Sequence, residues 1–526
     1  MKKLTLFSLA FFICLGMAAK APKSPFPKSQ KEDKGNKVMS QAYWDIWNPE
    51  VQARIDADID ANRKADAVLN LTGLPSGTRV KIEQISSDFV FGAHIFNFNQ
   101  LGTHERNERY KALYGTLFNS ATIGFYWRDF EPVPGKLRFK TEYEDTEEFW
   151  NNCQDPKRQP HWRRPSTDQV VEFCESKGIR LHGHPLIWGS RRWHYPWWMR
   201  DSLATPKEEA ILKTFIGWKK DRKTKKPTEK YTPLYKSLTA AQVSDSLPEF
   251  AKTMTELHDK RIREIAAHYQ GRIHSWDVAN ESASDFKRMK SGSPLMKSSY
   301  GIMPADYTWK AFQTAASVFP ENVKLNINEE SLGSNYHSQV KDLLKRGCKV
   351  DIMGAQQHLF KHQQCLDIAE GKDLRTPAKT MAWYNKIRVE GVPIHISEVT
   401  ISAPGDDERG RQIQAVIARN LYRIWFSLPQ AMGITWWNVV DDCGAPGEPD
   451  TSGLFDRDMN PKPSYFAVSE LINKEWRTNL TVKLKKDKTV RFRGFKGKYR
   501  MTWTAKDGST VTKEFHLSGN GDGITL

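Results

Sequence analysis

The sequence predicts a (β/α)8 TIM barrel, an α/β fold in which parallel strands alternate with helices. Between about residues 89 and 470, short apolar segments alternate with amphipathic segments of helical period, which is typical of parallel strands joined by helical crossovers. Eight such apolar segments can be counted, the number that closes into a barrel. They are residues 89–96, 119–127, 179–189, 273–281, 323–330, 350–359, 393–402 and 432–441.

Two of the intervening helices have clear signals. Ser246 and Glu249 have the spacing of a capping box, apolar residues follow at helical intervals, and Gly271 predicts the end of that helix. A second helix is predicted at about 409–427, where isoleucine and leucine side chains share one face.

The composition divides the chain into four parts. Residues 1–21 combine two lysines, an apolar run and small residues, which predicts a signal peptide that is removed on export to the periplasm or the cell exterior. Residues 22–88 hold a linker, a helix and strand-like segments, and the barrel is expected at 89–474. In residues 475–526 apolar and polar residues alternate, which predicts a small β-module. We expect this module to pack against the strands at 66–90, because both are too small to be stable alone.

A long connection at about 190–245 follows the third barrel strand. Connections of this kind form the active-site face of a barrel, so this insertion is predicted to shape a cleft. Its basic segment, residues 217–230, contributes to a formal net charge of +17. Because the basic segments lack interleaved aromatic residues and nucleic-acid-binding motifs, they favour an acidic polysaccharide as partner over nucleic acid. No segment after the N-terminal apolar run is long enough to span a bilayer.

Five cysteines follow the N-terminal apolar run, and none has the CxxC spacing of a zinc site. At most two disulfides are possible, and buried free thiols are equally compatible with the sequence. These cysteines are Cys153, Cys174, Cys348, Cys365 and Cys443.

Chemically active side chains lie at the predicted carboxyl ends of the strands, where barrel active sites are built. Glu281 ends the fourth segment and Glu398 lies in the seventh, so closure of the barrel would direct both into one cleft. Two carboxyls suit cleavage of a glycosidic bond, because one must hold a proton for the leaving oxygen while the other stays ionised. The other residues at these ends include His184, Trp188, Asn280, Asn328, Gln356, His358, Trp437 and Asp441.

Six segments carry a family resemblance. They are HGHPLIWG, WDVANE, GAQQHL, ISEVTI, GITWWNVVDD and GLFDRDMNPKPSYFAV, and they follow one another between about residues 89 and 470. In these segments the chain resembles glycoside hydrolase family 10, the retaining endo-1,4-β-xylanases of (β/α)8 fold.

The resemblance implies a double displacement in which Glu281 is the acid/base and Glu398 the nucleophile, without metal or cofactor. It also implies a monomer acting on xylan, and the basic insertion adds the hypothesis of glucuronic-acid decorations on that polymer. The implied substrate-binding set surrounds the sugar beside the scissile bond: Asn280 at its 2-hydroxyl, His184 and Trp188 along its subsite, Trp437 beneath it, and Gln356 and His358 supporting Glu398.

The chain departs from the family pattern in its sugar contacts. In the second strand segment, NSATIGFYWRDFEP, Tyr126 occupies the place of the family's Lys, and the family's Asn is missing. Gly189 replaces a His, and DDCGAPGEPD stands where a second Trp is expected. We therefore expect this chain to share the reaction of the family more closely than its substrate.

Two alternatives to a xylanase remain, and a third, a metal-dependent amidohydrolase, is disfavoured. One is a hydrolase of the same mechanism acting on another β-linked polysaccharide, and a second is a non-catalytic carbohydrate-binding protein. The HGH triplet at 182–184 resembles the HxH of metal-dependent amidohydrolases, but the other ligands of those enzymes do not align.

Overall fold

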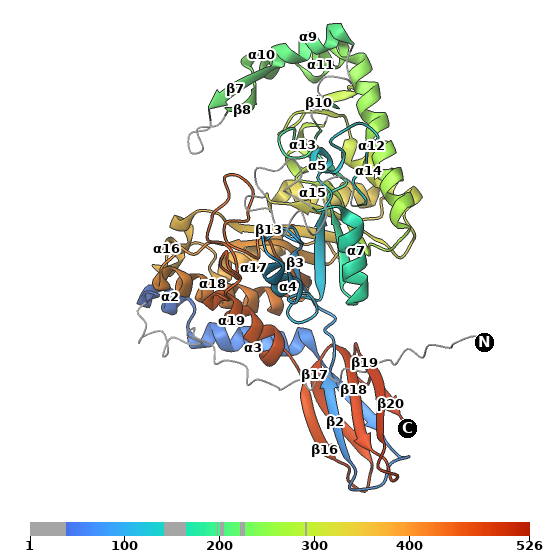
Figure 1. Cartoon of the computed structure of the whole chain (residues 1–526). Coiled ribbons are helices and arrows are strands. Elements are labelled where there is room, and N and C mark those ends of the chain that lie inside the picture. The colour runs from blue at the N-terminus through green and yellow to red at the C-terminus, as the bar shows by residue number, and fades with distance from the viewer. Residues whose placement is uncertain (1–37, 141–164, 197, 200–204, 221–226, 290–291) are drawn as a thin grey trace, which may run out of the picture.

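A computed structural model describes residues 38–140, 165–196, 198–199, 205–220, 227–289 and 292–526 (Figure 1). The predicted signal peptide at 1–21, Cys153 and Trp197 lie outside the described residues.

Eight parallel strands form a closed barrel, which confirms the predicted (β/α)8 fold. The last strand pairs with the first, and the fourth pairs with the fifth, so the ring is complete. A two-residue strand, β6 (Ile187–Trp188), adds to the edge of the fourth. In chain order the barrel strands are β3 (Val90–His94), β4 (Ser120–Gly124), β5 (Arg180–His184), β9 (Ser275–Asn280), β12 (Lys324–Glu329), β13 (Ile352–Leu359), β14 (Ile394–Ile401) and β15 (Ala431–Trp436).

The barrel strands are covered on both faces, so polar as well as apolar residues within them are buried. All eight residues of β14 are buried, as expected for a parallel strand between a filled barrel interior and an outer layer of helices. Glycines allow the largest side chains to enter this core. A Cβ atom on Gly183 would overlap the fully buried ring of Trp276, so the glycine sets the close packing between β5 and β9.

Helices surround the barrel and connect its strands (Figure 1). The predicted helix at 409–427 is confirmed, and it is almost wholly buried between the barrel and the N-terminal helices. The helices are α4 (His104–Lys111), α5 (Trp127–Phe130), α7 (Thr167–Ser176), α12 (Pro248–Tyr269), α13 (Ala283–Arg288), α14 (Tyr307–Val318), α15 (Ser334–Lys345), α16 (His362–Ala369), α17 (Pro377–Ile387), α18 (Glu408–Ser427), α19 (Pro463–Glu470) and the π-helix η2 (Leu471–Glu475).

The insertion between β6 and α12 projects from the barrel on the side away from the terminal β-strands (Figure 1). It packs on the hairpin that follows α13, and the Tyr235 hydroxyl donates a 2.9 Å hydrogen bond to the Gly301 carbonyl oxygen there. The elements of the insertion are α9 (Pro206–Phe215), β7 (Ile216–Lys220), β8 (Pro227–Tyr231), α10 (Pro233–Ser237) and α11 (Ala240–Ser246), and the hairpin is formed by β10 (Leu295–Lys297) and β11 (Ile302–Pro304).

The predicted capping box at Ser246 and Glu249 is wrong. Ser246 is the last residue of α11, and its hydroxyl donates to the Gln242 carbonyl oxygen. The next helix, α12, starts at Pro248, whose fixed φ suits a first helical position. Its free N–H groups are satisfied from another element, because the Glu208 carboxylate of α9 accepts the Glu249 N–H at 2.9 Å. The predicted end of α12 at Gly271 is confirmed within one residue, where the chain turns with φ of 90°.

Strands from both ends of the chain form one β-sandwich beneath the barrel (Figure 1). This pairing confirms that the strands at 66–90 pack with the C-terminal module. One sheet has the order β17 (Thr489–Phe495), β1 (Lys64–Asn70), β20 (Gly523–Thr525), and the other the order β16 (Asn479–Lys483), β2 (Arg79–Gln84), β18 (Gly497–Thr504), β19 (Thr510–Leu517).

The two N-terminal helices, α2 (Gln41–Ile46) and α3 (Pro49–Arg63), join the sandwich to the barrel. Arg63 at the end of α3 donates to the carbonyl oxygens of Phe426 and Leu428 below the barrel. In α2, the Tyr43 hydroxyl accepts a 2.7 Å hydrogen bond from the Asn420 amide of α18.

Among the described helices, none combines the length and the apolar character needed to cross a membrane. Cys174, Cys348 and Cys365 are buried free thiols, and the Cys443 sulfur accepts a hydrogen bond from Arg457.

Candidate active site

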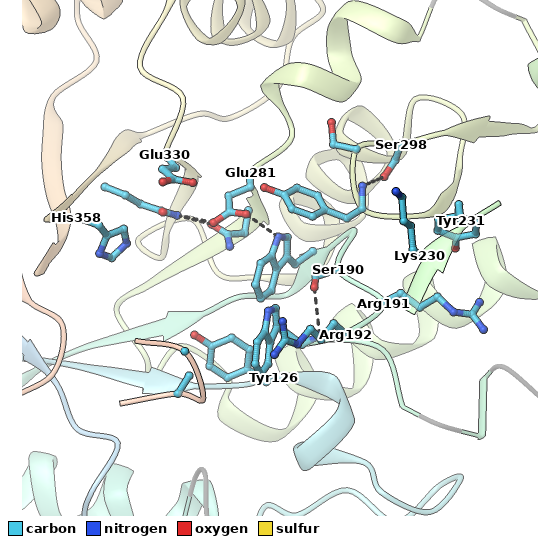
Figure 2. Close-up of a pocket in the computed structure, with 18 of the residues that line it drawn as sticks. Tyr126, Ser190, Arg191, Arg192, Lys230, Tyr231, Glu281, Ser298, Glu330 and His358 are labelled. Atoms are coloured by element: carbon cyan, nitrogen blue, oxygen red, sulfur yellow. Dashed lines mark hydrogen bonds between the residues drawn. The ribbon is translucent and has the colours of Figure 1, made fainter. Parts of the chain in front are cut away.

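A cleft of about 1270 Å³ opens at the carboxyl ends of the barrel strands (Figure 2). Its volume exceeds that of ordinary small-molecule pockets, so it has room for several sugar rings. The structure brings all eight sequence-predicted site residues to its walls: His184, Trp188, Asn280, Glu281, Gln356, His358, Glu398 and Trp437.

Glu281 stands at the point where β9 ends. Its φ of 52° lies in the left-handed region, a strained conformation for a residue with a side chain. A 2.8 Å hydrogen bond from its N–H to the Asn328 carbonyl oxygen holds this turn. Its carboxylate accepts hydrogen bonds from Trp188 Nε1 and Gln356 Nε2, each 3.2 Å long, and a further one from the Tyr300 hydroxyl.

Glu398 lies within β14 and is only 3 % exposed. One carboxylate oxygen accepts a 2.7 Å hydrogen bond from Asn328 Nδ2, and His184 Nε2 lies 3.8 Å from the same oxygen. The other oxygen is 3.2 Å from His358 Nε2. The carboxylate is therefore held from three sides, which fixes it in one position facing the cleft.

A buried ion network supports this carboxylate from below. Asp277 lies between His182 Nε2, at 2.9 Å, and His184 Nδ1, at 2.7 Å. Although burial opposes ionisation, the two histidines lower the pKa of Asp277, so it is a carboxylate at neutral pH. It orients the His184 ring toward Glu398. Within the described residues, no group of three or more His, Cys, Asp or Glu has the arrangement of a metal site.

Asn280 is oriented by its neighbours. Its Oδ1 accepts from Asn328 Nδ2 at 2.9 Å and from Gln356 Nε2 at 3.2 Å. Both contacts use the oxygen, so the amide nitrogen is the atom left to donate to a ligand in the cleft.

The predicted contact between Gln356 and Glu398 is corrected by the structure. Gln356 lies beside Glu398 in the sheet, but its amide donates to Glu281 and Asn280. The register of β13 and β14 shifts just before this residue, and Asn328 supplies the amide that reaches Glu398.

Aromatic side chains form one wall of the cleft. Phe96, Tyr126, Trp188 and Trp437 pack as a small cluster, with Trp193 at its edge. Tyr126, the residue at the position of the family's Lys, is 5 % exposed and is thus largely an apolar packing group. The Trp437 indole N–H donates to the Glu448 carboxylate, which also accepts from Asn438.

Several lining residues were missed by the sequence reasoning. Tyr300 lies in the turn of the β10–β11 hairpin, and Glu448 lies in the loop after β15, so neither is at a strand end. No local signal distinguishes them from ordinary loop residues. Glu329 has a supporting role, because its buried carboxylate accepts the N–H groups of Ala283 and Ser331.

Burial dominates the electrostatics of the two central carboxyls. It raises the pKa of Glu281 to about 7, with a further contribution from the negative charge of Glu398. It also raises the pKa of Glu398 to about 8, opposed by His184 and by the hydrogen bond from Asn328. Because the two charges repel each other, Glu281 and Glu398 together hold at least one proton near neutral pH.

The sequence model of glycosyl hydrolase family 10 matches residues 232–471, a range that includes both Glu281 and Glu398. The match assigns residues 232–471 of the barrel to glycosyl hydrolase family 10. The protein is accordingly a glycoside hydrolase. The family-10 match begins after β3, β4 and β5, so it leaves out the segment in which Tyr126 departs from the family pattern.

The known proteins to which this chain is similar are distant in sequence. Endo-1,4-beta-xylanase B of Thermotoga neapolitana is 23 % identical over 319 residues, covering 59 % of this chain and 74 % of that enzyme. Endo-1,4-beta-xylanase A of Halalkalibacterium halodurans is 24 % identical over 340 residues, covering 59 % and 73 %. A solved family-10 structure from Paenibacillus barcinonensis is 20 % identical and has a TM-score of 0.48, covering 74 % of this chain and 96 % of that one.

Proposed function

We propose that this chain is an exported, retaining hydrolase that cleaves the β-1,4-xylosidic bonds of xylan. One observation carries the proposal: two buried carboxyls, Glu281 and Glu398, come from different strands and face one cleft with different hydrogen-bond partners. The names of the two xylanase relatives support xylan as the polymer.

In the first step, Glu281 protonates the glycosidic oxygen while Glu398 attacks the anomeric carbon. Burial keeps a proton available on Glu281 up to about pH 7. The positive charge that develops on the sugar ring in the transition state stabilises the Glu398 carboxylate beside it, so the reacting form carries its proton on Glu281 and leaves Glu398 ionised. The products are the released leaving chain and a glycosyl ester on Glu398.

In the second step, the Glu281 carboxylate takes a proton from water, and the water oxygen displaces Glu398 from the anomeric carbon. Asn280 would donate to the 2-hydroxyl of the sugar, a bond that strengthens as the ring becomes cationic. Since burial lowers the pKa of His358 to about 4, that ring is neutral at pH 7. The Glu398 carboxylate can only accept, so the neutral ring donates to it through Nε2–H, and Nδ1, which is 2.9 Å from the Thr400 hydroxyl, accepts from that hydroxyl.

The stereochemistry of the product tests this mechanism. Proton NMR of xylan hydrolysis should show the β-anomer of the new reducing end first, because two displacements retain configuration. Initial formation of the α-anomer would contradict a glycosyl-enzyme on Glu398.

A second candidate is a hydrolase of the same mechanism that acts on another β-linked polysaccharide. The buried aromatic position of Tyr126 favours it, since the family places a Lys that contacts sugar there. Rates of reducing-sugar release from glucuronoxylan, arabinoxylan and mixed-linkage glucan separate the two candidates. Preference for the glucan would replace xylan as the substrate and leave the chemistry unchanged.

Export is proposed from the sequence of residues 1–21. Expression of the full chain in a bacterium should give a mature protein shortened by about 21 residues outside the cytoplasm. Mass spectrometry of fractionated cells measures this, and a full-length cytoplasmic product would contradict it.

Substitution of Tyr300 by phenylalanine should move the alkaline limb of the kcat/KM profile to higher pH. The Tyr300 hydroxyl lowers the pKa of Glu281 by stabilising its carboxylate, so its loss raises that pKa. Glu281 acts as an acid, and activity falls as pH rises through its pKa, so a higher pKa moves the fall upward. An unmoved limb in Tyr300→Phe would show that this hydroxyl does not tune the acid.

A further inference from the structure

The cleft has two ends of opposite charge. Its carboxylates stand at the ends of barrel strands and in the loop after β15, whereas its basic side chains come from the insertion and from the connection after β9. Figure 2 shows Arg191, Lys230 and Tyr231 on one side of Glu281, and Glu330 and His358 on the other. The basic end consists of Arg191, Arg192, Lys230, Lys236, Arg288 and Lys297.

Two of the cations at the basic end, Lys297 and Arg288, are oriented by neutral hydrogen-bond partners. Within the residues that the structure describes, Lys230, Lys236, Arg288 and Lys297 form no salt bridge with Asp or Glu. Lys297 is held instead by backbone, since its ammonium donates to the carbonyl oxygens of Lys236 and Leu238. Arg288 is held by a 2.9 Å hydrogen bond to the Ser299 hydroxyl. Neutral partners orient these cations without cancelling their charge.

The basic end is also a built part of the fold. The Tyr231 and Tyr235 rings pack together with centroids 4.2 Å apart, and the Tyr235 hydroxyl bonds to Gly301. These contacts fix α10 of the insertion against the β10–β11 hairpin. In the resulting wall Lys236 lies beside Lys297. The same hairpin carries Tyr300, whose hydroxyl contacts Glu281.

We propose that this basic end binds an anionic substituent, a carboxylate or a sulfate, carried by a sugar of the polysaccharide. The proposal rests on the proposed function, because that function places a sugar chain in the cleft. Lysine and arginine cations with unsatisfied N–H groups recognise such anions through charge-assisted hydrogen bonds. The position along the cleft means that the substituent lies on a sugar other than the one attacked by Glu398.

The test compares oligosaccharides of one backbone that carry one uronic acid, the methyl ester of that acid, one sulfate, or no substituent. Dissociation constants for the inactive Glu398→Gln variant are measured by calorimetry at low and high salt. We expect the acid to bind roughly three- to tenfold more tightly than its methyl ester, an advantage that high salt removes.

The double variant Lys230→Gln/Lys236→Gln should lose this advantage while binding the unsubstituted oligosaccharide as before. A matched control, Lys485→Gln/Lys486→Gln, removes two exposed lysines of the β-sandwich and should keep it. Tighter binding of the acid, of the sulfate or of both identifies the substituent and supports the proposal. Equal binding of acid, ester and sulfate forms overturns it, as does an advantage that survives the cleft variant.

Cleavage of the unsubstituted xylo-oligosaccharide by the wild-type enzyme is measured in parallel. Absence of cleavage with a retained advantage for the acid would overturn the xylan backbone and leave the anion site standing. Cleavage of the xylo-oligosaccharide without an advantage for the acid would overturn the anion site and leave xylan as the backbone.

Discussion

Replacement of Glu398 by alanine should lower kcat by roughly 10⁴- to 10⁶-fold, the range seen when a covalent nucleophile is removed. The remaining site would bind the sugar chain and offer a proton, but no atom would be in place to form the glycosyl ester. Steady-state rates on a xylo-oligosaccharide measure this loss. The variant should keep the dissociation constant within a few-fold, because the hydrogen bonds to other sugars remain.

The pH dependence of stability serves as a control for the correct folding of the Glu398 variants. Burial raises the pKa of Glu398 to about 8 in the folded protein, above its value in the unfolded chain. Stability from this group is therefore fully present at acidic pH and is lost as pH rises through about 8. Glu398→Gln has no such charge, so its Tm relative to wild type should increase from pH 5 to pH 8. A Tm at or below the assay temperature would show that the loss of activity includes unfolding of the variant.

The barrel could be predicted from sequence because its strands are buried on both faces. The segment at β14 has β-branched apolar residues at Ile394, Ile396, Val399 and Ile401, which is typical of a strand, although the polar residues between them are buried as well. Glu281 and Glu398 were found for a related reason: a barrel delivers strand-end side chains into one place, so position along the chain implies position in space.

Features that depend on contacts between distant segments could not be predicted. The carboxylate that accepts the Glu249 N–H in the first turn of α12 belongs to Glu208, which lies 40 residues before Pro248, and no local pattern links the two segments. The Gln356 amide turns to Glu281 because of a register shift in the sheet. Tyr300 reaches the acid from a hairpin whose place depends on packing against the insertion.

Replacement of Glu281 by alanine should reduce cleavage of unactivated xylan by roughly 10²- to 10⁴-fold, the usual contribution of a general acid or base. The leaving alkoxide of a sugar is a poor leaving group without a proton. An aryl xyloside with an acidic phenol needs no proton, so its first step should be nearly as fast as in the wild type. The second step should then limit turnover, because no base is left to deprotonate water.

Azide separates these two roles of Glu281. It is an anionic nucleophile that needs no base, and the side chain lost in Glu281→Ala leaves room for it beside the glycosyl ester. Azide should therefore restore turnover of the aryl xyloside by Glu281→Ala and yield a β-xylosyl azide, whereas Glu398→Ala should form no β-xylosyl azide. Glu329→Gln is a matched control, since that carboxyl is also buried near the end of its strand but bonds only to backbone N–H groups of the adjoining loops. Near-normal activity of Glu281→Ala on polymeric xylan would show that Glu281 is not the general acid, because the leaving oxygen of unactivated xylan must be protonated.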